Sequence, residues 1–249
     1  MLRFVRRLFC SSVLDPANLG ERARDVVFRE MKEADIPTCL GFYRGNEAAH
    51  FPPGRFEYYA EELRERAFLT LIATRENRPV GCCGIQLGAN GAATFCFGMV
   101  DPAFQRQGIG TAQVLVRIAL LDPVNDLAVA GLLAVPGSVS FYKRFGFVFM
   151  REVPGEDGGI YQLGVIMVSR SFVEDCRNVL AERNITYPDV RDKIPKEPRL
   201  NSAAPGDGAT ALLFSVERLG GAVPEPGRSA KTSRAIVIIA KVSALWPNI

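Results

Sequence analysis

The sequence predicts a mixed α/β domain, in which helices flank a mostly antiparallel central sheet, with a C-terminal extension. Strand and helix periodicities alternate along the chain from Asp25 onward. Segments 68–74, 80–87 and 93–100 are apolar and joined by short turns, which is typical of an antiparallel meander. Segment 127–135 is apolar almost throughout, which indicates a strand covered on both faces.

The other elements are expected in the order that this alternation sets. Further strands are expected over 26–31 and 161–168, and helices over 34–43, 55–66, 110–121, 138–145 and 172–183. Asp35 and Ser138 are expected N-caps, and Gly146 stands where a left-handed C-cap favours glycine. Prolines interrupt the last third of the chain, where we expect strands only over 210–219 and 234–243.

These patterns divide the chain into a basic segment 1–24, a domain 25–169 and an accessory extension 170–249. Three arginines precede Asp15, the first acidic residue, which is typical of a mitochondrial transit peptide. The alternative is a basic N-terminus without a targeting role, so the expected location is the mitochondrial matrix or the cytoplasm. The apolar faces of the extension are expected to pack on the domain or on a second copy of the chain.

Composition excludes several classes of function. With 30 basic and 27 acidic residues, the net charge of +3 is too small to indicate a nucleic-acid surface. No apolar run approaches the roughly 18 residues of a membrane span, which predicts a soluble protein. The six cysteines form no C-x-x-C pair, which favours a reducing compartment, and Cys82 and Cys83 should face opposite sides of a strand. With His50 as the one histidine, we expect no zinc site, no other metal and no Ser-His-Asp triad.

Gly108 and Gly110 lie between a predicted strand and a predicted helix. Glycines there leave backbone N–H groups accessible at the positive end of the helix dipole, which is a cradle for pyrophosphate. The spacing does not fit a dinucleotide fold, because Gln113 occupies the third glycine position, and the pattern of a P-loop is absent.

This segment resembles the acetyl-CoA-binding motif of the GCN5-related N-acetyltransferase (GNAT) superfamily, V-x-P-x-x-[QR]-x-x-G-x-[GA]. Its fixed positions are matched by Val100, Pro102, Gln105, Gly108 and Gly110. The second family signature, Y-x-x-x-G-F on a short helix after an apolar strand, is matched by Tyr142, Gly146 and Phe147. The resemblance covers about residues 25–169 and implies the acyl-CoA N-acyltransferase fold.

The resemblance also implies a function, which is acetyl transfer from acetyl-CoA to an amine by direct attack in a ternary complex. Met99 and Val100 would pair with the pantetheine arm at a splay between two parallel strands. The pyrophosphate would be held by the backbone amides of Gln105, Arg106, Gln107, Gly108, Ile109, Gly110 and Thr111. Tyr142 would protonate the leaving thiolate, and its alternative role is that of a core tyrosine.

The sequence departs from many relatives in lacking a carboxylate in the strand 93–100. Either a water chain or one of Glu30, Glu47 and Glu57 would have to deprotonate the amine, and glutamates at such positions are more often solvated surface residues. Cys96 is expected to be a small core residue rather than a nucleophile.

Other departures concern the acceptor and the cofactor loop. Val135-Pro-Gly stands where relatives often have an asparagine. The loop 44–55 is expected to shape a pocket for a small amine or a peptide, with His50 either in that loop or in the pocket wall. The alternative function is a non-catalytic acyl-CoA-binding module, and the oligomeric state is expected to be a monomer or a homodimer.

Overall fold

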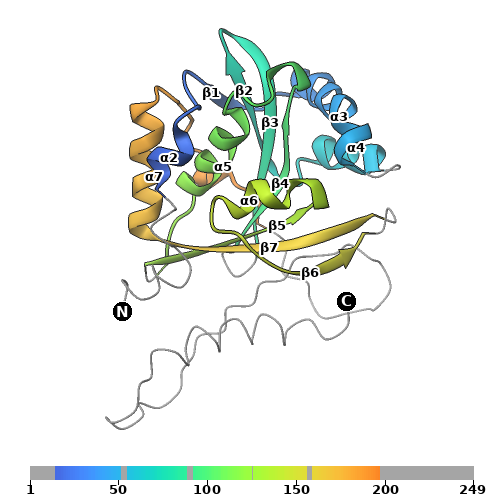
Figure 1. Cartoon of the computed structure of the whole chain (residues 1–249). Coiled ribbons are helices and arrows are strands. Elements are labelled where there is room, and N and C mark those ends of the chain that lie inside the picture. Colours follow the sequence, from blue (N-terminus) through green and yellow to red (C-terminus); the bar gives the residue numbers. More distant parts are fainter. Residues whose placement is uncertain (1–14, 52–54, 89–91, 125, 156–158, 197–249) are drawn as a thin grey trace.

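A computed structural model describes residues 15–51, 55–88, 92–124, 126–155 and 159–196 (Figure 1). The strands 210–219 and 234–243 expected from the sequence lie outside these residues, as does most of the basic N-terminal segment. In the described part of the chain, no helix is long and apolar enough to cross a membrane.

In the described part of the chain, seven strands form one sheet in the order β1-β2-β3-β4-β5-β7-β6. They are β1 (Val27–Glu30), β2 (Leu69–Arg75), β3 (Arg78–Leu87), β4 (Ala93–Val100), β5 (Leu127–Ala134), β6 (Val148–Pro154) and β7 (Ile160–Ser169). Neighbouring strands are antiparallel except for β4 and β5, which are parallel. The predicted α/β class with a mostly antiparallel sheet is therefore confirmed, whereas the sequence analysis missed β6.

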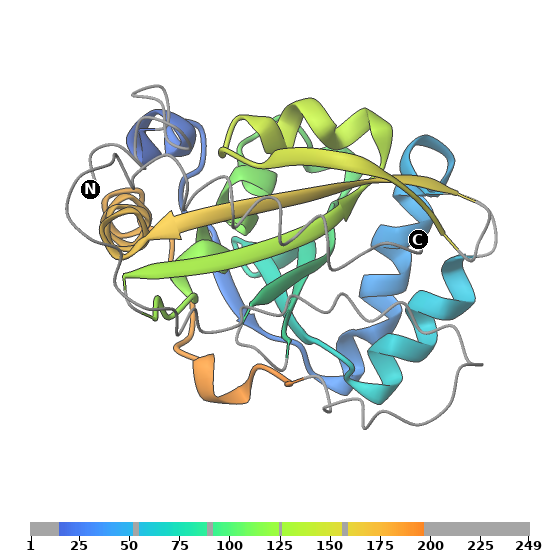
Figure 2. The ribbon, with the colours of Figure 1, turned by 90° about the horizontal axis from the view of Figure 1, so that it is seen from below.

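Helices cover both faces of the sheet. They are α2 (Pro16–Gly20), α3 (Ile36–His50), α4 (Arg55–Glu65), α5 (Ile109–Ala119), α6 (Val139–Lys143) and α7 (Arg170–Glu182), with 3-10 turns η1 (Glu33–Asp35), η2 (Pro102–Phe104), η3 (Pro136–Ser138) and η4 (Arg191–Lys193). Helices α2, α5 and α7 lie on one face, while α3 and α4 lie on the other (Figures 1 and 2). Each face has its own apolar core. Cys83 belongs to the core under α5 and Cys82 to the core under α3 and α4, as the sequence analysis predicted.

Some local predictions hold and others do not. Gly146 has a φ of 91°, the left-handed conformation expected of it. Asp35 makes no side-chain bond to the helix that follows. Its carboxylate instead accepts two hydrogen bonds from the Arg29 guanidinium, at 2.6 and 2.7 Å. The Ser138 hydroxyl likewise donates to the Val135 carbonyl, at 2.9 Å, instead of capping α6.

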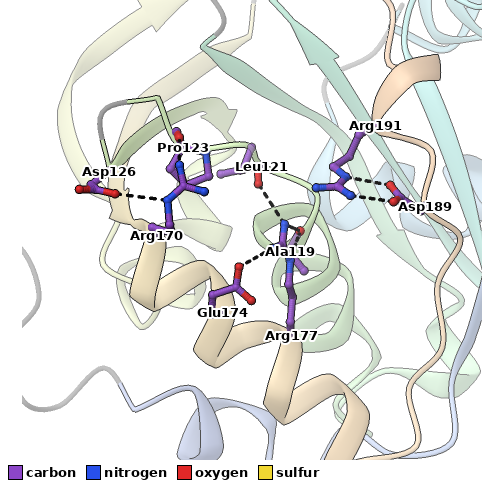
Figure 3. A network of polar contacts seen from close by, with 9 residues as sticks. All are labelled: Ala119, Leu121, Pro123, Asp126, Arg170, Glu174, Arg177, Asp189 and Arg191. Carbon is purple, nitrogen blue, oxygen red and sulfur yellow. Dashed lines mark hydrogen bonds and ion pairs between the residues drawn. The ribbon is translucent and has the colours of Figure 1, made fainter.

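The beginning of the predicted extension packs against the rest of the fold. Helix α7 lies beside α5 and α2, and its side chain Arg177 donates hydrogen bonds to the carbonyls of Ala119 and Leu121 at the end of α5 (Figure 3). The chain then pairs with the free edge of β1, where Phe28 N–H donates to the Thr186 carbonyl at 2.7 Å. Residues 170–196 thus cover a helix and a sheet edge.

Helix α2 also packs in this body, although it falls within the segment 1–24 that the sequence analysis set apart. Leu19 is 8% exposed and Ala23 is fully buried. A Cβ added to Gly20 would lie 2.6 Å from Val179 of α7, so the two helices are in close contact. Asp15 caps α2 by accepting a hydrogen bond from the Ala17 amide at 2.9 Å.

Candidate functional site

A groove of about 1380 Å³ opens where β4 and β5 diverge. The two parallel strands pair only at Ala93 with Ala130 and at Thr94 with Gly131, so the rest of β4 separates from β5. This is the splay expected from the sequence. Because the separated edges carry backbone groups that no longer pair with each other, an extended ligand can add between them.

One end of the groove is formed by the loop from Gln105 to Thr111. Arg106 and Gly108 adopt left-handed conformations, with φ of 64° and 85°. Helix α5 begins at Ile109, so the amides of its first turn have no acceptor within the helix. Left-handed residues followed by a helix N-terminus form a concave array of N–H groups, which favours an anion.

The reason for glycine at position 108 differs from the one expected. A Cβ there would lie 2.4 Å from the backbone carbonyl carbon and oxygen of Arg22 and 2.6 Å from the amide of Ala23. The glycine therefore accommodates the protein's own N-terminal segment as well as the left-handed backbone. At Gly110, by contrast, a Cβ would meet Phe141 at 3.5 Å, which is ordinary contact.

Gln105 positions the loop through its side chain. Its Nε2 donates to Oδ1 of Asn46 at 2.9 Å, and the buried Asn46 donates in turn to the carbonyl of Val100 at 3.0 Å. Its backbone amide is already bonded to Pro102 at 3.4 Å. The Met99 carbonyl accepts from Gln113 Nε2 at 2.7 Å. These hydrogen bonds hold Met99, Val100 and Gln105, which belong to the predicted binding set, in place at the splay.

Tyr142 lies on α6 and lines the groove. Its ring packs edge-on against Phe141 and Phe147, with centroids 5.0 and 5.6 Å away. Its hydroxyl points toward β4, because a Cβ built on Gly98 would lie 3.5 Å from Oη. Its ring therefore packs against the core and its hydroxyl reaches the groove, while protonation of the leaving thiolate by Tyr142 stays a prediction.

The other half of the groove is lined by one face of α4, where Arg55, Tyr58 and Glu62 follow each other at helical spacing. Burial raises the pKa of Tyr58 to about 12, so its hydroxyl stays protonated and can donate to Glu62. Burial also raises the pKa of Glu62, and the hydrogen bond from Tyr58 opposes that shift. A carboxylate with a raised pKa is better suited to accept a proton near neutral pH.

Sequence reasoning missed Glu62. Among the described residues that line the groove, the only carboxylates are Glu21 and Glu62, and Glu21 precedes Arg22, whose backbone lies against Gly108. The glutamates considered from the sequence, Glu30, Glu47 and Glu57, are not among the lining residues, and Glu30 is paired with Lys193 at 2.8 Å. Cys96 lines the groove, while the side chain of His50 lies outside the described part of the structure.

Residues 66–149, which include β2 to β5 and the loop before α5, match the family model described as "Acetyltransferase (GNAT) domain". This part of the chain is similar to a GNAT acetyltransferase domain. This confirms the resemblance inferred from the two motifs. None of the curated proteins matches the sequence.

The solved structures to which this chain is similar include three at 14–19% sequence identity. Ard1 from Thermoplasma volcanium is 19% identical, with a TM-score of 0.47 over 58% of this chain and 98% of that protein. An aminoglycoside N(6')acetyltransferase from Legionella pneumophila is 14% identical, with a TM-score of 0.49, and the match covers 62% of this chain and 96% of that protein. N-acetylglutamate synthase from Neisseria gonorrhoeae, complexed with coenzyme A and L-arginine, is 18% identical, with a TM-score of 0.44. The match covers 59% of this chain and 34% of that protein.

Proposed function

We propose that this GNAT domain transfers an acetyl group from acetyl-CoA to an amine, which attacks the thioester directly in a ternary complex. One observation carries the proposal. The same groove is lined by the left-handed loop that precedes α5 and by a carboxylate with a raised pKa, and the Tyr142 hydroxyl points toward β4 in that groove. Such a groove can align a thioester and an amine, and alignment supplies much of the rate enhancement.

The half of the groove at the left-handed loop is assigned to CoA because of its positive charges and its backbone amides. Exposed Arg22, Arg106 and Arg144 line the groove near the left-handed loop. They would meet the phosphates of CoA. The amides from Arg106 to Thr111 would hold the pyrophosphate, and the separated edges of β4 and β5 would hold the pantetheine arm. The chemistry that acetyl-CoA supplies there is an activated acyl group on a thiol leaving group.

The acceptor half is assigned to the amine because of Glu62. Glu62 would accept a proton from the attacking amine, whose nitrogen forms a bond to the carbonyl carbon. The bond between that carbon and sulfur breaks, and Tyr142 would give its proton to the departing sulfur. The aromatic rings of Tyr58, Phe97 and Tyr161 line the same half, and the guanidinium carbon of Arg55 lies 5.3, 5.5 and 4.8 Å from their centroids.

The test is release of CoA thiol from acetyl-CoA in the presence of a panel of small amines and peptide N-termini. We expect turnover with at least one acceptor, and a fall in kcat of about a hundredfold or more in both Glu62→Gln and Tyr142→Phe. Activity of the natural chain should fall as the pH drops through the raised pKa of Glu62, because the protonated carboxyl cannot act as a base. This acidic limb should be missing in Glu62→Gln.

Glu57→Gln is the matched control, since Glu57 lies on the same helix, is exposed and is outside the groove. It should retain full activity. If CoA binds but no amine supports turnover, the result favours the alternative, a non-catalytic acyl-CoA-binding module. Full activity of Tyr142→Phe would assign this residue to the core alone.

A further inference from the structure

Arg117 is a buried cation that neither of the two motifs uses. It lies near the end of α5 and is 1% exposed, and it is the largest of the fully buried side chains. Its Nε donates to the carbonyl of Gln113 at 3.1 Å, and its guanidinium carbon lies 4.6 Å from the centroid of the Phe95 ring. Among the described residues, no carboxylate forms an ion pair with it.

The guanidinium reaches the groove at the point where Tyr142 does. A Cβ built on Gly98 would lie 3.1 Å from Nη2 of Arg117 and 3.5 Å from Oη of Tyr142. Gly98 is exposed and lies beyond the last paired residues of β4 and β5, and all three residues line the groove. A side chain at position 98 would separate the cation from the groove, so the glycine leaves Nη2 at the groove wall.

Stability does not explain a charge at this position. Burying a cation without a counter-ion is costly, and an apolar residue of similar size often serves packing equally well or better. The aromatic face and one backbone carbonyl offset only part of that cost. Fixed charges in a site from which water is excluded are effective where an anion develops during a reaction.

We propose that Arg117 stabilises the negative charge on the CoA sulfur as it leaves the acetyl group. This inference rests on the proposed function. As the amine nitrogen bonds to the carbonyl carbon, the electron pair of the carbon–sulfur bond passes to sulfur, which lies beside Nη2 as a thiolate until Tyr142 protonates it. The proton that the amine loses goes to Glu62, so charge and protons balance.

The experiment compares CoA with desulfo-CoA, which lacks the sulfur, by calorimetry between about pH 6 and about pH 9, across the range in which thiols ionise. In the natural chain, the preference for CoA over desulfo-CoA should rise with pH by about tenfold or more, because Arg117 binds the thiolate more tightly than the thiol. Arg117→Met, of similar length but uncharged, should lose that rise, and Arg117→Lys should keep part of it. Ultraviolet absorbance of the bound thiolate gives a second readout without turnover.

Different outcomes overturn different claims. If both ligands bind and their ratio does not depend on pH in the natural chain, the role of Arg117 is wrong while the cofactor site stands. If neither ligand binds, the proposed function itself is overturned, and this inference with it. Tighter binding of succinyl-CoA than of acetyl-CoA together with a flat ratio would assign the cation to a carboxylate on the acyl chain and overturn the proposal. The natural chain alone decides these cases, so a Met variant that fails to fold does not prevent the test.

Discussion

Two glycines of the predicted pyrophosphate loop meet different constraints, although both stand at fixed motif positions. Gly108 has a left-handed backbone and touches the backbone of Arg22, so any side chain there strains the fold itself. Gly110 has room for a Cβ and lies in the first turn of α5, facing Phe141 and the groove. A substitution at Gly110 therefore tests cofactor binding with less effect on folding than a substitution at Gly108.

We predict that Gly110→Asp weakens CoA binding by at least about tenfold, or about 1.4 kcal/mol, relative to Gly110→Asn. The two side chains have nearly the same shape, so the difference reports the negative charge placed beside the phosphates. The same charge at a helix N-terminus should stabilise α5 by about 0.3–1 kcal/mol. Calorimetry and thermal unfolding of the two variants measure these opposite effects, and equal CoA affinities would contradict the assignment of the loop.

Two residues of the candidate site show why sequence reasoning stopped where it did. Arg117 stands in a helix pattern where arginine ordinarily marks a solvent-facing position, but α5 is enclosed between the sheet and α7. Glu62 belongs to a segment rich in Glu and Arg, which predicted an exposed helix, and only the placement of α4 beside β4 brings it to the groove. Local pattern fixes neither placement, because both depend on contacts between segments far apart in the chain.

At the scale of elements, Arg177 joins α7 to the end of α5. Its guanidinium donates to the Ala119 carbonyl at 2.8 and 3.0 Å and to the Leu121 carbonyl at 3.3 Å, and it pairs with Glu174 at 2.6 Å (Figure 3). The last carbonyls of a helix have no partner within it, and a cation there also complements the helix dipole. Arg177 thus donates hydrogen bonds to carbonyl groups that α7 covers and that would otherwise lack a donor.

Arg177→Ala should lower the free energy of unfolding by about 2 kcal/mol, because hydrogen bonds from a charged donor are lost and the carbonyls of α5 stay covered. That corresponds to a fall in Tm of about 4–8 °C. Glu174→Gln is the matched control. Its carboxylate is 51% exposed, so the loss of this ion pair should cost less than about 1 kcal/mol. Similar losses for both variants in chemical denaturation would mean that the contact with α5 carries no special weight.

The element pattern was predictable where apolar residues alternate or cluster, as in β2 to β5, and not where an edge strand lacks them. β6 was missed because Val148 is 48% exposed and the strand around Arg151 is only partly buried, so no face repeats at a period of two. It lies at the edge of the sheet and pairs only with β7. A strand held by one neighbour needs little apolar pattern of its own.

At the scale of the whole molecule, the N-terminal segment helps to form the groove. Asn18, Leu19, Glu21 and Arg22 line it, and the Arg22 backbone covers Gly108. The sequence analysis set residues 1–24 apart as a possible transit peptide, but only the part before Asp15 can be removed without opening this wall. We therefore propose that the domain begins near Asp15.

We predict that a chain starting at Asp15 retains the CoA affinity and Tm of the full chain, whereas a chain starting at Asp25 loses both. The longer deletion removes the buried Leu19 and Ala23, which should cost at least about 2 kcal/mol of stability. It also removes one wall of the phosphate site, so CoA affinity should fall more than about tenfold, an effect that calorimetry measures. Arg22→Gln in the full chain separates the two causes, because it removes the proposed phosphate contact and leaves the packing intact. If the chain starting at Asp25 bound CoA as tightly as the full chain, the N-terminal helix would lie beside the groove without contributing to it, and the boundary at residue 25 would be the correct one.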